Sequence, residues 1–240
     1  MVAQRSTKEA SKVIRIGKSE MDNKMGGGIP AGSLVLVEGQ SDSGKSVLVQ
    51  HYIGGALKGG SKVVCYTNEN TVKSLVRQMT SLGMDVTDEF LLGYLSVFPV
   101  MALERGDSAE DHFNRLVSHI DSLDKEFDVI ILDSITNLVT HSKEDEVIDF
   151  FSTCKRLCDQ GRTIFLVVHS HAFSESMLIR VRSLCDGHFS LKVTYVGDRM
   201  VKMLEVAKIR GAERTTGNIV SFDVEPELGI KIIPIVMAKA

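Results

Sequence analysis

The segment 39–46, Gly-Gln-Ser-Asp-Ser-Gly-Lys-Ser, constrains the fold of this chain more than any other. It fits the pattern G-x-x-x-x-G-K-[S/T], it follows an apolar run at 34–37, and it precedes an amphipathic stretch at 46–57. In that context the backbone N–H groups of the loop and of the following helix form a cradle for phosphate groups. The sequence therefore predicts a strand, a phosphate-binding loop and a helix in succession, rather than a glycine-rich turn that only starts a helix.

This motif predicts a site for ATP and Mg²⁺. We expect the Lys45 ammonium to contact the β- and γ-phosphates and the Ser46 hydroxyl to be a ligand for Mg²⁺. The other residues that we expect to bind ATP lie in the loop or in the first turn after it: Gly39, Ser41, Asp42, Ser43, Gly44 and Val47.

A carboxylate at the end of a nearby strand would complete the magnesium site. Asp133 closes the apolar run 129–132, where the aspartate of a Walker B strand is expected. Many apolar strands end in Asp for reasons of turn formation alone, but the phosphate loop upstream favours a role in binding. We expect Asp133 to hold the metal through a water molecule.

Glu69 follows the expected strand 61–67 and could reach over the carboxyl edge of the sheet as a general base that orients water. The alternative is that Asn68, Glu69 and Asn70 form a polar helix N-cap, with Glu69 interacting with the helix dipole. Both interpretations stay open from the sequence.

His169 and His171 end the expected strand 162–168 at the same edge. One of them, His169 first, could sense the γ-phosphate. A strand-end histidine that bonds to a neighbouring loop is the alternative.

Apolar β-branched runs alternate with amphipathic stretches over most of the chain. We expect strands at 33–38, 61–67, 128–133 and 162–168, with helices at 45–58, 71–82, 109–125 and 144–160. Continuous apolar strands fit a parallel sheet that is covered on both faces. The predicted fold class is therefore α/β, with a mostly parallel central sheet flanked by helices.

The pattern changes after residue 186. Short strand-like segments at 187–196, 200–209, 218–224 and 229–235 predict an antiparallel extension of the same sheet. We expect residues 1–11 to form a loose N-terminus and residues 12–240 to form a single domain.

Charge and composition restrict the function further. The formal net charge of −3 and the lack of a basic run argue against a nucleic-acid partner. No apolar stretch approaches the ~20 residues that span a bilayer, and the polar N-terminus lacks a secretory signal, so we expect a cytoplasmic protein without membrane insertion. Cys154 and Cys158 are four residues apart on an expected helix; a metal pair is conceivable, but core thiols are favoured without a second such pair.

Several segments together resemble the KaiC group of RecA-like proteins, over residues 12–235. The resemblance lies in 26–32 (GGGIPAG), 67–85, Asp133-Ser134, 207–211 (AKIRG) and 229–234. It implies a RecA-like P-loop NTPase fold. It also implies that Lys208 and Arg210 reach the nucleotide of a neighbouring subunit, although an ordinary basic strand face is the alternative.

Within that group the chain is most similar to the accessory ATP-binding family of the archaeal flagellum (archaellum), called FlaH or ArlH. The similarity lies in 46–50, 69–75, 78–79 and 81–83. It implies a homo-oligomeric, hexameric ring that is docked at the cytoplasmic face of the membrane through its partners. The motor ATPase FlaI is the partner that the resemblance implies, and assembly rather than turnover is the implied activity.

Two residues depart from the KaiC pattern. KaiC domains carry two adjacent glutamates where this chain has Glu69 and Asn70, and a loop glycine where it has Asp42. One carboxylate fewer and a negative charge near the phosphates favour tight or slow handling of ATP. The leading hypothesis is an ATP-dependent assembly switch with slow or absent hydrolysis; a KaiC-like signalling ATPase with turnover is the alternative, and a recombinase or an inactive P-loop is disfavoured.

Overall fold

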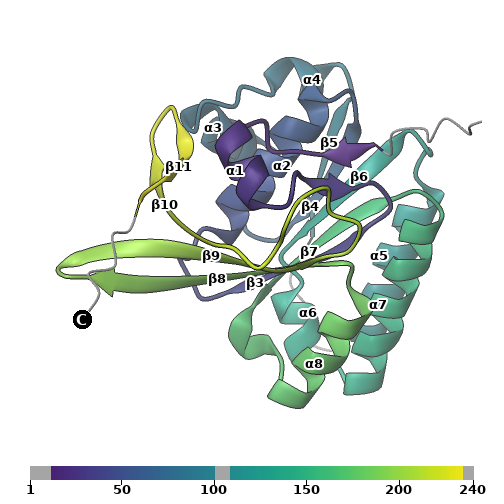
Figure 1. The fold of residues 1–240 in the computed structure, drawn as a ribbon. Coiled ribbons are helices and arrows are strands. Elements are labelled where there is room, and N and C mark those ends of the chain that lie inside the picture. Colours follow the sequence, from purple (N-terminus) through teal and green to yellow (C-terminus); the bar gives the residue numbers. More distant parts are fainter. Residues whose placement is uncertain (1–11, 101–108, 235–240) are drawn as a thin grey trace, which may run out of the picture.

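A mixed sheet organises residues 12–100 and 109–234, which are the residues that the computed structural model describes (Figure 1). Within these residues nine strands lie in the order β11-β10-β9-β8-β3-β7-β6-β4-β5. Six of them are parallel: β3 (Leu34–Gly39), β4 (Lys62–Thr67), β5 (Leu95–Pro99), β6 (Phe127–Asp133), β7 (Thr163–His169) and β8 (Gly187–Val196).

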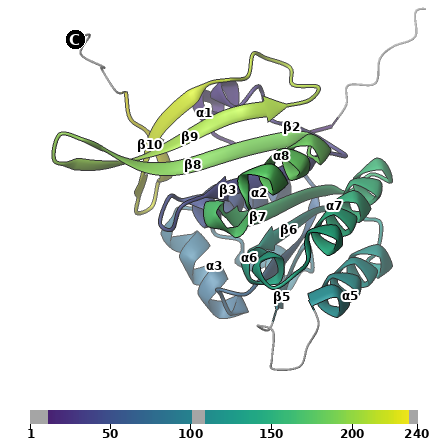
Figure 2. The same cartoon turned by 90° about the horizontal axis from the view of Figure 1, so that it is seen from below.

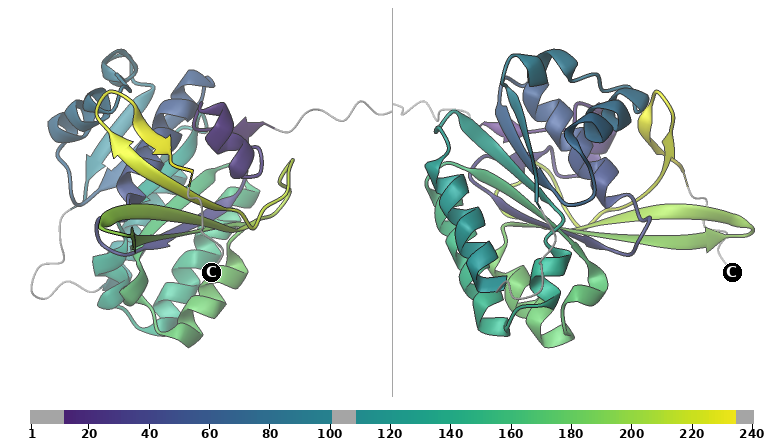
Figure 3. Two further views of the ribbon diagram at one scale, coloured as in Figure 1. Left: turned by 60° about the vertical axis from the view of Figure 1, so that its left-hand side comes forward. Right: turned by 180° about the vertical axis from the view of Figure 1, so that it is seen from behind.

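The last strands continue this sheet in the antiparallel sense. They are β9 (Arg199–Ile209), β10 (Ile219–Glu225) and β11 (Gly229–Ile232). The β8–β9 hairpin extends well beyond the body of the molecule (Figures 1 and 3). The expected α/β fold, with a mostly parallel sheet and an antiparallel extension, is confirmed. The first segment of the expected extension, 187–196, differs: it forms β8, which is parallel to β3 and antiparallel only to β9.

Helices cover both faces of the sheet (Figure 2). One face carries four helices from the N-terminal part of the chain, namely α1 (Ser19–Lys24), α2 (Lys45–Lys58), α3 (Val72–Ser81) and α4 (Thr87–Leu91). The other face carries α5 (Ala109–Ser122), α6 (Thr136–Thr140), α7 (Glu144–Asp159) and α8 (Glu175–Leu184), and a 3₁₀ turn, η1 (Ser170–Ala172), precedes α8. A separate two-stranded ribbon pairs β1 (Val13–Ile14) with β2 (Ile29–Pro30).

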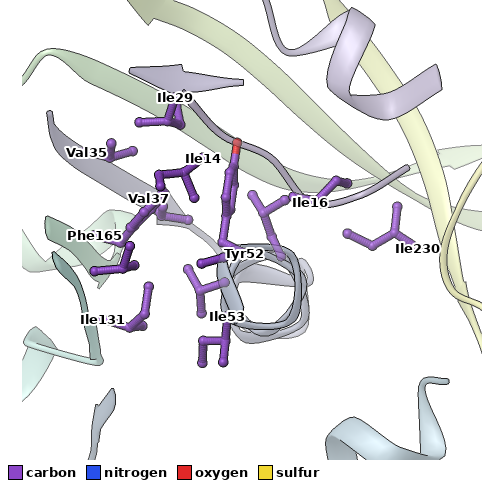
Figure 4. Close-up of a cluster of buried hydrophobic side chains, with 14 of the residues drawn as sticks. Ile14, Ile16, Ile29, Val35, Val37, Tyr52, Ile53, Ile131, Phe165 and Ile230 are labelled. Atoms are coloured by element: carbon purple, nitrogen blue, oxygen red, sulfur yellow. The ribbon is translucent and has the colours of Figure 1, made fainter. Parts of the chain in front are cut away.

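The core forms two clusters because side chains alternate between the faces of each strand. In β3, Val35 and Val37 pack into the cluster around α2, whereas Leu34 and Leu36 pack into the cluster under α7 and α8. Tyr52 of α2 lies against Phe165 of β7, with 4.6 Å between ring centroids (Figure 4). The sheet is therefore buried on both faces, as its continuous apolar strands predict.

The expected strands and helices lie within a few residues of the observed ones. The sequence interpretation missed the short elements β1, β2, α1, α4, β5, α6 and η1, and also α8. The predicted loose segment 1–11, and residue 235 of the last expected strand, lie outside the described residues. Cys154 and Cys158 are both buried in the core beneath α7, where the core-thiol interpretation places them.

Candidate nucleotide site

Four parallel strands end at the same edge of the sheet, and their ends form the site. The register places Gly39 of β3 beside His169 of β7, and Thr67 of β4 beside Asp133 of β6. The residues that follow these strands therefore meet, although they are far apart in the sequence. This edge carries the phosphate loop 39–46, Glu69, Asp133 and His169.

The phosphate loop is folded around the carbonyl oxygen of Gln40. The Lys45 ammonium donates to that oxygen at 2.6 Å and the Ser43 hydroxyl at 2.7 Å. Gly44 is the N-cap of α2 in the left-handed region (φ 93°), and Asp42 is left-handed as well (φ 58°). Asp is among the few residues with a side chain that adopt this conformation readily, so Asp42 allows the loop to close where KaiC has glycine.

Gly39 is required by close packing rather than by its backbone angles. A Cβ at this position would lie 2.4 Å from the carbonyl oxygen of Leu191 in β8 and 2.8 Å from the Ser43 hydroxyl. The backbone N–H of Gln40 donates to the same Leu191 oxygen at 3.3 Å, and Val193 N–H donates to the Gln40 side chain at 3.0 Å. Strand β8, the parallel neighbour of β3, thus holds the loop directly.

A cavity of about 510 Å³ opens beside this loop. Predicted residues form much of its wall: Ser41, Asp42, Gly44, Lys45, Ser46, Val47, Glu69 and His169. Three further wall residues were not predicted, namely Gln78 of α3, Lys202 of β9 and Val224 of β10. The volume lies within the usual range for small-molecule sites.

Asp133 is buried and does not line this cavity, but it interacts with Ser46 of the cavity wall through a side-chain hydrogen bond. Burial raises the pKa of Asp133 to about 6, and the nearby Glu69 raises it as well, while Ser46 and Lys45 lower it. Its Oδ1 atom has no hydrogen-bond partner among the described residues. An unpaired carboxylate oxygen next to a loop serine fits a hydrated Mg²⁺ ion, which takes oxygen ligands and keeps several waters.

Lys45 lies in the same charged group. Burial lowers the pKa of Lys45, whereas Asp133, Glu69 and Asp42 raise it. Burial thus destabilises the charged forms of both Lys45 and Asp133. Three carboxylates lie around this one cation of the loop. The described residues contain no group of three or more His, Cys, Asp or Glu side chains that could hold a metal alone. Mg²⁺ would therefore depend on phosphate oxygens for further ligands.

Glu69 lines the cavity, and the N-cap interpretation of this segment is wrong. Helix α3 is capped by Thr71, whose side chain accepts from Ser74 N–H, so residues 68–70 precede the cap. Backbone N–H groups of Glu69 and Asn70 donate to the Thr67 hydroxyl at 3.2 Å each. This turn holds the Glu69 carboxylate toward Lys45 and Asp133, where a base for water activation is expected.

The two histidines lie next to each other at the end of β7. Their ring centroids are 5.1 Å apart, and only His169 lines the cavity. Burial lowers the pKa of His169, and Lys45 and His171 lower it further. The backbone N–H of His169 donates to the Thr136 hydroxyl, while its buried Nδ1 has no partner in the described chain. A neutral His169 ring is thus available to the cavity.

Lys208 and Arg210 do not join this site within the chain. Lys208 is opposite His188 of β8, which pairs with Leu36 of β3, and Arg210 follows the end of β9, so at least about 10 Å of strand separates them from the phosphate loop. Lys208 donates to the Arg182 carbonyl at 2.9 Å, and Arg210 donates to the Ser183 carbonyl and to Asp186. They lie toward the start of β3, away from the chain's own phosphate loop.

Among the described residues, none of the helices combines the length and apolar character that crossing a bilayer requires.

The comparisons with known proteins cover almost the whole chain. A family model described as "ATPase: KaiC" matches residues 14–236. The archaeal flagellar ATP-binding protein FlaH of Sulfolobus acidocaldarius is 31% identical over 231 residues, which cover 95% of this chain and 100% of that protein. FlaH of Methanocaldococcus jannaschii is 29% identical, over 91% of this chain and 94% of that protein.

A solved structure and a more distant relative agree with these matches. The crystal structure of flagellar accessory protein FlaH from Methanocaldococcus jannaschii superposes with a TM-score of 0.79 at 27% identity, covering 93% of this chain and 100% of that one. The circadian clock oscillator protein KaiC of Prochlorococcus marinus is 24% identical, and the match spans only 42% of its length. The chain therefore belongs to the archaeal flagellar FlaH family, within the KaiC-type ATPases.

Proposed function

We propose that this protein is the ATP-binding component of the archaellum motor and acts as a nucleotide-dependent assembly switch for the motor ATPase FlaI. The observation that carries the proposal is the closed phosphate loop, whose Lys45 faces a cavity of about 510 Å³ beside the buried Asp133. The FlaH relatives supply the biological setting.

ATP binding would use the loop and the residues around it. Backbone N–H groups of the loop and of the N-terminus of α2 would donate to the phosphate oxygens, and Lys45 would neutralise part of their charge. Ser46 and Asp133 would hold Mg²⁺, Asp133 through water. Bound Mg²⁺ neutralises the phosphate oxygens and polarises them. The unpaired Oδ1 of Asp133 supports this arrangement.

Slow or absent hydrolysis follows from the residues beside the loop. Glu69 is the only carboxylate in the turn 68–70, and the side-chain oxygen of the adjacent Asn70 accepts from the Ser74 hydroxyl at 3.1 Å. Asp42 adds a negative charge to the loop itself. A single base in an acidic cavity favours retention of ATP over cleavage.

Assembly would report nucleotide occupancy. Lys208 and Arg210 lie at the sheet end opposite to the chain's own loop, so a neighbouring subunit in a ring, hexameric in this proposal, would receive them at its γ-phosphate. FlaI would bind to the nucleotide-loaded ring. The ring would remain in the cytoplasm and dock at the membrane through the motor proteins.

The substitution Lys45→Ala tests the proposal. We expect it to abolish ATP binding by isothermal titration calorimetry and, together with it, ATP-dependent assembly measured by light scattering. Lys58→Ala is the matched control, because Lys58 lies at the exposed end of the same helix. A Lys45→Ala protein that binds no nucleotide yet assembles and supports swimming would contradict the switch.

A KaiC-like signalling ATPase with genuine turnover is the second candidate, favoured by the position of Glu69 beside Lys45 and Asp133. Steady-state phosphate release separates the two functions. Turnover at 1 s⁻¹ or more, roughly the range of ordinary enzymes, that is abolished by Glu69→Gln would favour the enzyme. Release far below that rate, with ATP binding intact, would favour the switch.

A further inference from the structure

A buried carboxylate lies directly behind the phosphate loop, on the other face of the sheet. Glu38 is the residue before Gly39 in β3, and only 2% of its surface is exposed. Because side chains alternate along a strand, Glu38 shares the face of Leu36, which is covered by α8, and not the face that packs on α2. The nucleotide site described above does not use it.

Two basic side chains face this carboxylate. The Arg182 guanidinium of α8 donates to Glu38 Oε1, and His188 Nε2 of β8 lies 3.1 Å from the same oxygen. Val168, the neighbour of Glu38 in β7, is apolar. The bonds to His188 and Arg182 hold the pKa of Glu38 low, against the opposing effect of burial. Glu38 is therefore an anion next to the loop, and His188 of β8 and Arg182 of α8 both stabilise its charge.

The same residue of α8 also contacts the other functional region. The backbone carbonyl of Arg182 accepts from Lys208, and the next carbonyl, of Ser183, accepts from Arg210. Lys208 is opposite His188 in the β8–β9 register, and His188 is opposite Leu36, two residues before Glu38 in β3. The C-terminal turn of α8 thus lies between the phosphate loop's strand and the Lys208–Arg210 pair.

We infer that α8 sets the affinity of the phosphate loop for nucleotide, because Arg182 neutralises the Glu38 charge that would otherwise repel the phosphates. Arg182 is a supporting residue and does not touch the nucleotide. By thermodynamic linkage, bound nucleotide strengthens the docking of α8 by the same factor. The inference rests on the nucleotide site proposed above and adds an element that regulates it.

Four variants test the inference by calorimetric titration with Mg-ATP and with ADP. Arg182→Met keeps the aliphatic stem and removes the charge, Glu38→Gln removes the carboxylate, and a double variant removes both. Arg182→Lys retains the cation. Arg180→Met is the matched control, since Arg180 lies on the same helix and pairs with the exposed Glu144.

Arg182→Met and Glu38→Gln are expected to change the affinity for ATP in opposite directions. Arg182→Met weakens ATP binding on the order of tenfold, because the charge of Glu38, no longer neutralised by Arg182, then repels the phosphates. Two charges ~10 Å apart at an effective dielectric of ~20 interact with about this strength. ADP loses less, since it carries less charge. Glu38→Gln tightens ATP binding, because the Arg182 charge then acts alone. The double variant, Arg182→Lys and Arg180→Met stay within about threefold of the unmodified protein.

Hydrogen exchange gives an independent readout. Backbone amides of α8 should exchange more slowly with ATP bound, and the double variant should lose this protection. A merely structural ion pair predicts weaker ATP binding for every variant that breaks it, and that outcome would overturn the inference. Should Arg182→Met fail to fold, the sign of the Glu38→Gln effect decides. Absence of ATP binding by the unmodified protein would instead refute the proposed function.

Discussion

At the scale of single residues, the site combines groups that each lose solvation. Burial raises the pKa of Asp133 to about 6 and lowers the pKa of Lys45, although the two charges attract each other. The carboxylate is destabilised further by Glu69. Such a site gains from a ligand that brings both a cation and anions, as magnesium and a triphosphate do, and costs stability without one.

Asp133→Asn should stabilise the protein in the absence of nucleotide and metal. The folded pKa of Asp133 lies above its ordinary value of 3.8, so the contribution of this group to stability is greatest at low pH and is lost as the pH rises toward 6. The amide does not ionise, so the advantage of Asp133→Asn grows between pH 4 and 6 and is constant above.

We expect an advantage of about 2–3 kcal/mol at pH 7, from a shift of roughly two units at 1.36 kcal/mol each. Urea unfolding at several pH values measures it, with the exposed Asp159→Asn of α7 as control. An advantage that is independent of pH would show that packing, and not ionisation, is responsible.

At the scale of elements, local sequence patterns predicted the long helices and the apolar strands and missed most of the short elements. Nearly every residue of β3, β4, β6 and β7 is buried. A short, continuous apolar run of this kind is typical of a strand that is buried on both faces of a sheet. The edge strand β5 ends in exposed Phe98 and Pro99, so its five residues carry no clear pattern. In α8 only Met177 and Val181 are buried and Ile179 is 60% exposed, which obscures the helical period.

The site shows the same division. Residues of the loop, with Glu69, Asp133 and His169, could be predicted because each follows a recognisable strand. Gln78, Lys202 and Val224 could not, because nothing local indicates which distant strands fold against the loop. Arg182 and Glu38 were missed for the reason that a buried ion pair depends on the register of β3 and the docking of α8.

Gly39→Ala tests how tightly β8 packs on the loop. Its Cβ would lie 2.4 Å from the Leu191 carbonyl oxygen, which is backbone and cannot rotate away. We expect loss of about 2–4 kcal/mol of stability and of ATP binding, measured by thermal unfolding and calorimetry. Gly54→Ala is the control, since its Cβ meets only the flexible Met84 side chain at 3.2 Å. Wild-type ATP affinity in Gly39→Ala would contradict this packing.

At the scale of the whole molecule, nucleotide and basic pair occupy opposite ends of one sheet. In the proposed ring, each subunit would complete its neighbour's site. Each chain also carries its own docking contacts for the pair, at the Arg182 and Ser183 carbonyls. Assembly and the position of α8 are therefore expected to respond together.

Replacing both Lys208 and Arg210 with Ala should separate binding from assembly. ATP affinity of the dilute monomer should stay within about twofold, because neither side chain reaches the chain's own loop, whereas ATP-dependent assembly should be lost. Light scattering and calorimetry on the same sample measure both, with Lys231→Ala as the exposed control. A large loss of affinity in the monomer would show that the pair acts within its own chain.

The contact between Gln40 and the β8 residues Leu191 and Val193 has a consequence for synthesis of the protein. The loop leaves the ribosome early, but the strands that hold it follow about 150 residues later. At roughly 5–20 residues per second, that delay is on the order of ten to thirty seconds. Since Lys202 and Val224 also form the cavity wall, a chain cut short before β9 would lack a complete nucleotide site. Only a chain whose synthesis has passed these strands could then bind nucleotide.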